Sequence, residues 1–133
     1  MSTELDLELA GALQGGTAPD LGEPTELWWR AGTLDTRAVD LVQIRFGFVP
    51  TTWIHFRIGP GDVGPQLDQL AAIVAAAVAA APGDAILHAD FEEVWLVRRG
   101  GELALSDDDT RWPPARAALL GPHTRAALDP PSL

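Results

Sequence analysis

The chain has 133 residues, no cysteine, and a formal net charge of −10 from 19 acidic and 9 basic residues. This length fits one domain, residues 1–133, with a core that needs no crosslinks, and the lack of cysteine excludes disulfides and thiolate metal sites. Every basic residue is an arginine, and such acidity argues against nucleic acid as a partner, because phosphates are bound through Lys and Arg. A basic protein partner is compatible with this charge.

The N-terminal part of the chain predicts two strands separated by a loop. Residues 3–9 (TELDLEL) alternate leucines with acids, which is typical of a half-buried strand. Residues 10–24 are rich in Gly and Pro and indicate a loop. Residues 25–32 contain two adjacent tryptophans and predict a second strand. The start of the chain lacks the basic region of a secretory signal, so we expect a cytoplasmic protein.

Residues 35–47 fit two structures. Asp35 as a cap and Gly47 as a stop favour a short helix. The apolar positions 42, 44 and 46 also fit a strand. We expect a helix here.

Residues 50–58 (PTTWIHFRI) predict a strand, because their side chains alternate with a period of two. Ile54, Phe56 and the other even positions share one face. Trp53, His55 and Arg57 share the other. The even face suits a core, and the odd face is a candidate for contact with a partner.

The principal helix is predicted at about residues 65–81. Pro65 suits a first helical position, apolar residues recur at a spacing of three to four, and Pro82-Gly83 ends the pattern. A membrane-spanning helix needs about 20 apolar residues. This run is shorter and contains Asp68, so we expect a core helix and no membrane insertion.

Residues 84–89 and 92–106 predict a strand followed by a hairpin. Gly100-Gly101 supplies the positive φ angles of a two-residue turn, which sets Arg99 opposite Glu102 as an opposite-charge pair. Simple alternation then assigns Val94, Leu96, Leu103 and Leu105 to one face, and Glu93, Trp95, Val97 and Ala104 to the other.

The last segment, residues 107–133, holds five of the eleven prolines and predicts an extended wrap with one short helix around 114–120. These elements together predict an α+β fold. It has a mainly antiparallel sheet of about five or six strands and one principal helix packed on one face.

The sequence carries no catalytic, metal or cofactor signature. The three histidines lack the spacing of zinc ligands. No serine lies in G-x-S-x-G, and a chain without lysine has no Walker loop. What remains is a candidate contact surface, because Trp and Arg dominate protein interfaces. We assign it to Trp53, His55, Arg57, Trp95 and Glu93. The alternative is that residues 10–24, 35–46 or the tail cover this face as a second small core.

Several segments in this order and spacing resemble the Sit immunity-protein family. They are Phe46-Gly47-Phe48 with Pro50, Phe56-Arg57, Pro82-Gly83-Asp84 and the run from Arg98 to Leu103, and the resemblance covers about residues 38–133. Members of this bacterial family protect cells against lipoprotein toxins exchanged by contact. The resemblance implies a non-enzymatic protein that binds and occludes a toxin.

Two other functions stay open from the sequence. One is a small-ligand-binding protein or minor enzyme, with a pocket between sheet and helix or under the tail. Its polar groups would be His55, His88 and the acids at 90, 92 and 93. The other is a homodimer formed through the tryptophan-bearing surface or a sheet edge.

Overall fold

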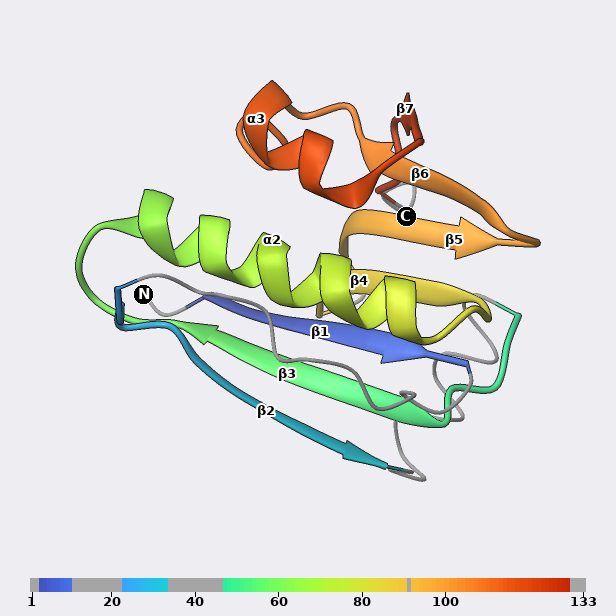
Figure 1. Cartoon of the computed structure of the whole chain (residues 1–133), viewed down its shortest axis with the longest axis horizontal. Helices are drawn as coiled ribbons and strands as arrows, with labels where there is room; N and C mark the ends of the chain where they lie inside the picture. Colours follow the sequence, from blue (N-terminus) through green and yellow to red (C-terminus); the bar gives the residue numbers. More distant parts are fainter. Residues whose placement is uncertain (1–2, 11–22, 34–46, 91, 130–133) are drawn as a thin grey trace.

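One seven-stranded sheet organises the protein, with a long helix on one face (Figure 1). The computed structural model describes residues 3–10, 23–33, 47–90 and 92–129, so the helix expected at 35–47 lies largely outside the described residues. The strand order is β2-β3-β1-β4-β5-β6-β7. The elements are β1 Thr3–Leu9, β2 Trp28–Thr33, β3 Thr52–Ile58, α2 Val63–Ala80, β4 Ala85–Ala89, β5 Glu93–Arg99, β6 Glu102–Ser106, α3 Pro114–Ala117, η1 Ala118–Leu120 and β7 Thr124–Ala126.

The α+β class is confirmed, but the predicted five or six strands are too few. The seventh strand, β7, comes from the tail and pairs with β6 in parallel, which makes the sheet mixed. All other neighbours are antiparallel. A three-residue strand has no periodicity to read, so only its pairing with β6 identifies it.

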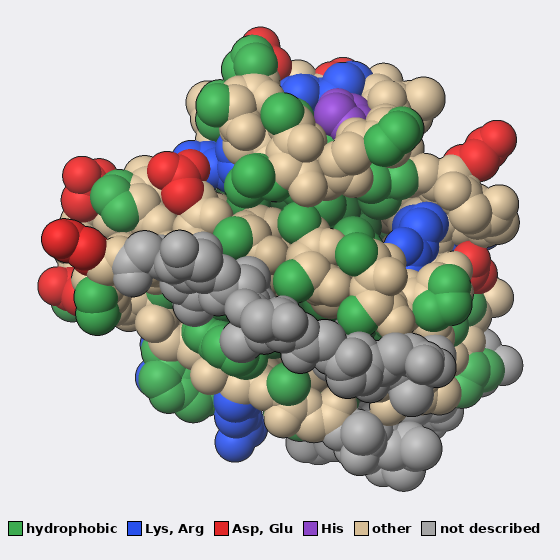
Figure 2. All heavy atoms as spheres, in the orientation of Figure 1, with side chains coloured by type: hydrophobic (Ala, Val, Ile, Leu, Met, Phe, Trp, Pro, Cys, Tyr) green, Lys and Arg blue, Asp and Glu red, His purple; other side chains and the backbone are tan. Residues whose placement is uncertain are grey.

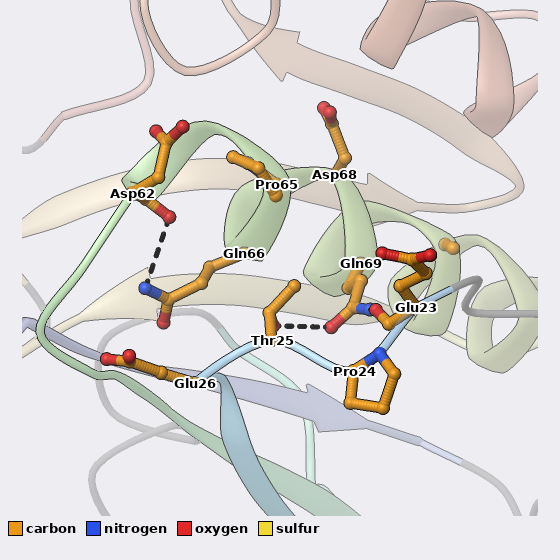
Figure 3. Close-up of a pocket in the computed structure, with 10 residues that line it drawn as sticks. Glu23, Pro24, Thr25, Glu26, Asp62, Pro65, Gln66, Asp68 and Gln69 are labelled. Carbon is orange, nitrogen blue, oxygen red and sulfur yellow. Dashed lines mark hydrogen bonds between the residues drawn. The ribbon is translucent and has the colours of Figure 1, made fainter.

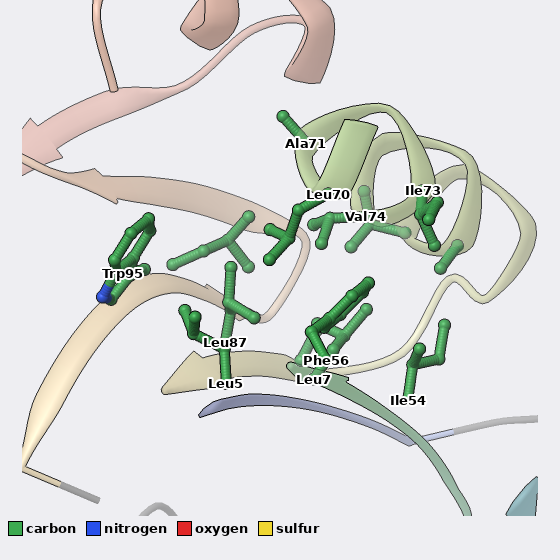
Figure 4. Packing of buried hydrophobic residues seen from close by; sticks show 14 of the residues in the cluster. Leu5, Leu7, Ile54, Phe56, Leu70, Ala71, Ile73, Val74, Leu87 and Trp95 are labelled. Atoms are coloured by element: carbon green, nitrogen blue, oxygen red, sulfur yellow. The ribbon is translucent and has the colours of Figure 1, made fainter. Parts of the chain in front are cut away.

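The strand β1 lies inside the sheet, between β3 and β4. Its leucines are fully buried on the α2 side, as the alternation predicts. In the register with β3, Leu5 lies opposite Phe56 and Leu7 opposite Ile54. These side chains meet Leu70 and Val74 of α2 (Figure 4).

The helix α2 begins two residues earlier than predicted. Asp62 is its N-cap, and its carboxylate accepts a hydrogen bond from Gly64 N at 3.2 Å, so Pro65 occupies the third helical position. With 18 residues and a mean hydropathy of 1.4, α2 is long and apolar enough to cross a membrane by length and composition. Length therefore does not assign it to the core; the packing of Leu70, Ala71 and Val74 in the main cluster does.

Arg98 of β5 completes the C-terminal end of α2. Its guanidinium donates to Val78 O at 2.5 Å, to Gly83 O at 2.8 Å and to Ala81 O. The last carbonyls of a helix have no partners within it, and a guanidinium offers several donors in one plane. Burial lowers the pKa of Arg98, and nearby Asp84 opposes that effect.

The hairpin forms as predicted, with Arg99 opposite Glu102 across Gly100-Gly101. The predicted assignment of faces in β5 holds for Leu96 and Val97 but is wrong for Val94 and Trp95. Leu87 pairs with Leu96 while His88 pairs with Val94, so Trp95 is an extra residue in a β-bulge. The bulge turns Trp95 into the main core beside Leu96 and sends Val94 to the opposite face.

The tail packs on the same side of the sheet as α2 (Figure 1). Trp112 is 1% exposed, lies edge-on to Trp95, and donates from Nε1 to Trp95 O at 2.6 Å. Arg116 of α3 reaches Asp68 of α2 at 3.0 Å. The short helix expected around 114–120 is confirmed as α3 and η1, whereas β7 adds a strand to what was predicted as an extended wrap.

Candidate protein-binding face

The face of the sheet opposite α2 carries aromatic, basic and acidic side chains on three adjacent strands. The register sets Glu4 of β1 and Trp28 of β2 on either side of Arg57, and Asp6 and Arg30 on either side of His55. We call this surface the Trp–Arg face; it consists of Glu4, Asp6, Trp28, Arg30, Trp53, His55 and Arg57.

Stacked guanidinium and indole groups give the Trp–Arg face its order. Arg57 Cζ lies 4.9 Å from the Trp28 ring centroid. Arg30 Cζ lies 5.8 Å from the Trp28 ring and 5.5 Å from that of Trp53. Each exposed cation–π contact contributes about 0.5–1 kcal/mol. These rings and cations are therefore held in place before any partner arrives, which lowers the entropy cost of binding.

His55 is fixed by two carboxylates. Its Nδ1 lies 2.6 Å from Asp6 Oδ1, and its Nε2 lies 3.4 Å from Glu4 Oε1. The edge of the imidazole meets Trp28, with centroids 6.0 Å apart. Glu4 also lies 3.6 Å from Arg57 Nε. The histidine is thus part of a charged network that orients neighbouring side chains.

Trp53 is the more buried tryptophan of this face, and its ring packs over Gly32 of the neighbouring strand. It is half-buried, and its ring occupies the space that a side chain at Gly32 would need: an ideal Cβ there would lie 2.4 Å from Trp53 Cζ2. Its Nε1 is buried and has no hydrogen-bond partner within the described part of the chain. Trp28, by contrast, is 42% exposed. Trp28 is therefore the better anchor for a partner, and Trp53 is a platform for Arg30.

The other half of the same sheet face is a second small core. Phe48, Ile86 and Val94 are buried there, with Ala10, Val97 and Leu128 packed against them. Between the two halves, His88 Nε2 lies 2.9 Å from Glu8 Oε2, and both residues are almost fully buried. The sequence offered a contact surface or a second core as alternatives; β2 and β3 carry the exposed face, and β4 and β5 carry the core.

Three of the five predicted contact residues come together, and two do not. Trp53, His55 and Arg57 lie on the Trp–Arg face. Trp95 is 8% exposed in the main core, because the bulge reverses its direction. Glu93 is exposed at the start of β5, where it pairs with Arg111 at 3.1 Å.

Sequence reasoning missed Trp28 and Arg30. Their spacing of two in a predicted strand indicated a common face. Which strand lies beside β2, however, is a long-range property, and only the pairing with β3 brings these residues to His55 and Arg57.

A pocket of about 700 Å³ lies elsewhere, between residues 23–26 and the first turns of α2 (Figure 3). Neither His55 nor His88 lines it; both belong to the opposite face of the sheet. Among the described residues, the two histidines and this pocket therefore lie on opposite sides of the sheet. Among those residues, no three His, Cys, Asp or Glu side chains are grouped to hold a metal ion.

These observations define a small α+β protein built on one open, mixed sheet, with a charged aromatic surface on the face away from its main helix. The chain belongs to the SitI3-like family, whose model matches residues 6–116. The match agrees in family with the predicted resemblance. It extends the predicted range toward the N-terminus, over β2 and most of β1, but leaves residues 117–133 outside. Comparisons with curated proteins and with solved structures give no match.

Proposed function

We propose that this protein is a non-enzymatic immunity protein of the cytoplasm that binds a protein toxin and neutralises it by occlusion. Membership of the SitI3-like family supports an immunity-type role. The single observation that carries the binding site is the pre-stacked Trp–Arg face, where Trp28, Arg30 and Arg57 are exposed on neighbouring strands.

The proposed mechanism has two steps. The net charge of −10 attracts a basic surface and speeds the encounter. The indole of Trp28 and the stacked guanidinium groups then anchor the partner, since tryptophan and arginine supply most hot spots in protein interfaces. Carboxylates Glu4 and Asp6 sit within the same surface and select cationic groups on the partner.

The test combines toxicity rescue with binding. Each product of an adjacent gene is expressed alone and together with this protein, growth is scored, and the affinity of any pair is measured by calorimetry. We expect one product to be harmful alone, harmless in the pair, and bound directly. If no adjacent product harms cells or binds, the proposal fails.

Surface variants test the site itself. Trp28→Ala and Arg57→Ala should each weaken binding at least tenfold, corresponding to a loss of about 1.4 kcal/mol or more. Leu119→Ala is the matched control, because Leu119 is also exposed but lies on η1, on the α2 side of the sheet. Equal affinities for all three variants would place the binding site elsewhere.

A further inference from the structure

The strand β2 forms one edge of the sheet and is open on both of its faces. Within the described part of the chain its only strand neighbour is β3. Trp28, Trp29, Arg30 and Ala31 are consecutive and all exposed, with Trp28 at 42% and Trp29 at 43%. A strand interior to a sheet does not expose four residues in a row. Among the described residues, the outer backbone groups of β2 therefore have no partner strand, and they offer an edge to another strand.

The two sheet edges differ in how they are protected. Proteins usually protect edges with very short strands, proline or lysine. The opposite edge, β7, has three residues. In contrast, β2 has six residues, two of them tryptophan, and contains no proline and a single charged residue, Arg30. Its length and side chains suit strand addition, the mode in which an extended segment extends a sheet.

An acidic pocket adjoins the start of β2. Residues 23–26 lead into the strand and form one wall, and the first turns of α2 form the other (Figure 3). Four carboxylates line it, from Glu23, Glu26, Asp62 and Asp68, and its described lining contains no basic side chain. Figure 2 shows acidic side chains gathered at this end of α2.

The polar groups of the pocket wall are largely engaged, whereas its charge is not neutralised. Thr25 Oγ1 donates to Gln69 Oε1 at 2.6 Å, and Gln69 Nε2 donates to Glu23 O at 2.6 Å. Asp68 points away from residues 23–26 and pairs with Arg116. Among the described residues, no ion pair involves Glu23 or Glu26. The negative charge of Glu23 and Glu26 thus meets no cation among the described residues.

We propose that β2 pairs with an extended segment of a protein partner, and that an arginine or lysine flanking this segment enters the acidic pocket. Trp29 lies on the same side of the sheet as the pocket, because it is opposite Phe56, whose side chain packs under α2. The added strand therefore places alternate side chains on Trp29 and on the Trp–Arg face. The statement that the partner is a toxin rests on the proposed function. The pairing of a partner strand and the basic residue beside it are inferred from the open edge of β2 and from the acidic pocket.

A second copy of this chain fits the edge less well. Each copy carries a net charge of −10 and no lysine, so two copies repel one another and neither offers the pocket a surplus of positive charge. The charge of the pocket selects a basic segment.

The test uses two synthetic peptides that differ only in charge. Both alternate threonine and valine, and one ends in two arginines where the other ends in two glutamates. Binding to the isotope-labelled full chain is followed by amide chemical shifts and hydrogen exchange. We expect the arginine peptide to shift and protect residues 23–33, and the glutamate peptide to leave them unchanged.

Two matched comparisons separate the parts of the proposal. The double variant Glu23→Gln with Glu26→Gln should bind the arginine peptide about tenfold more weakly. The control, Glu102→Gln with Asp109→Asn, removes the same net charge from remote exposed residues. It should change the affinity for that peptide less than twofold. Two further peptides carry N-methyl groups on one or the other set of alternate amides. Exactly one set faces β2 in a paired strand, so only one of the two should lose binding.

Three results would overturn the inference: equal binding of both charged peptides, shifts mapping outside residues 23–33, or a concentration-dependent dimer that already protects β2. The outcome is separable from the proposed function. Toxicity rescue without peptide binding would refute strand addition and leave the proposed function standing. Peptide binding without any harmful adjacent product would refute the proposed toxin partner and leave strand addition standing.

Discussion

Trp53 and Gly32 illustrate how one residue without a side chain shapes the Trp–Arg face. Gly32 is in strand β2, where glycine is otherwise unfavourable. Its place is explained by the indole of Trp53, which fills the position of the missing side chain. That indole in turn supports Arg30.

We expect Gly32→Ala to destabilise the protein by about 1–3 kcal/mol, because the added methyl group overlaps the Trp53 ring and forces it to move. The free energy of unfolding in urea, followed by circular dichroism, measures this. Gly64→Ala is the control: it lies in α2, and its nearest neighbour would be Asp62 Oδ1 at 3.7 Å. That variant should be neutral or up to about 1 kcal/mol more stable. Equal stabilities would contradict the close contact.

Arg98 is the other residue with an effect beyond its own position, because it joins β5 to the end of α2. We expect Arg98→Met to lower the free energy of unfolding by about 2–3 kcal/mol, since helix carbonyls lose a charged donor. Arg98→Lys should retain less than half of the stability lost in Arg98→Met, because a single ammonium group cannot reach three carbonyls in one plane.

Arg57→Met supplies the comparison for Arg98. Arg57 is exposed, and its ion pair with Glu4 at 3.6 Å is also exposed, so its loss should cost less than about 1 kcal/mol. A cost for Arg57→Met equal to that for Arg98→Met would show that Arg98 does not act as the helix cap.

At the scale of elements, the tail is attached to the sheet through a pair of tryptophans. Both rings are buried. Trp112 Nε1 donates a hydrogen bond, whereas Trp95 Nε1 has no hydrogen-bond partner among the described residues. The tail segment between β6 and α3 is therefore anchored to the bulged strand β5 by this buried hydrogen bond, in addition to the contacts of Arg111 with Glu93 and Val94 O.

The difference in hydrogen bonding between the two indole groups can be tested with one substitution in each tryptophan. Trp112→Phe should be more destabilising than Trp95→Phe by about 1–2 kcal/mol, because it leaves the buried Trp95 carbonyl without its donor. Urea unfolding of the two variants checks this. If Trp95→Phe were the more harmful change, the indole of Trp95 would have a polar role that its contacts do not reveal.

The segment that follows β7 and the start of β5 are linked by an acid-sensitive contact. Arg111 lies 2.9 Å from Asp129 Oδ1, and Val94 N donates to the same oxygen at 2.8 Å. The hydrogen bond from Arg111 is the main reason that the pKa of Asp129 lies below its ordinary value, and it raises the pKa of Arg111.

The direction of the pKa shift determines the pH dependence. Because the folded-state pKa of Asp129 is below the unfolded value, its stabilisation is present above about pH 4 and is lost as the pH falls through the folded pKa. Solvent exposure limits it to less than about 1 kcal/mol. Asp129→Asn should flatten this acid loss and speed hydrogen exchange at Val94, whereas Asp109→Asn should do neither. An unchanged acid profile for Asp129→Asn would refute the link.

At the scale of the whole molecule, charge and shape act on different steps of binding. The net charge of −10 acts over roughly the Debye length, about 8 Å at physiological ionic strength, whereas the Trp–Arg face acts only on contact. The first should govern the association rate and the second the dissociation rate.

Ionic strength separates these contributions. If the proposed partner is a basic protein, its association rate constant should fall at least tenfold between low and high salt, while the dissociation rate changes much less. Stopped-flow fluorescence across a salt series measures both. Trp28→Ala should show the opposite pattern, with faster dissociation and the same salt dependence of association. If Trp28→Ala left the dissociation rate unchanged, Trp28 would not be part of the interface.

The strands β1 and β3, the helix α2 and the 100–101 turn follow from the sequence alone. Their signals are local: leucines two apart in residues 3–9, apolar residues three to four apart around Leu70, and two glycines at a hairpin turn. A backbone of fixed period presents such residues to one side, so pattern and structure agree. The composition also fixes the negative charge and the absence of disulfides.

Only the tertiary structure decides where Trp95 points, which strand lies beside β2, and that the tail contributes β7. A bulge adds one residue and reverses the facing of those before it, yet nothing in Val94-Trp95-Leu96 distinguishes a bulge from regular alternation. The neighbours of an edge strand are set by pairing between distant segments. Periodicity reports the local backbone, whereas the Trp–Arg face and the open edge of β2 depend on long-range register, and that is why the sequence supplied Trp53, His55 and Arg57 but not Trp28 and Arg30.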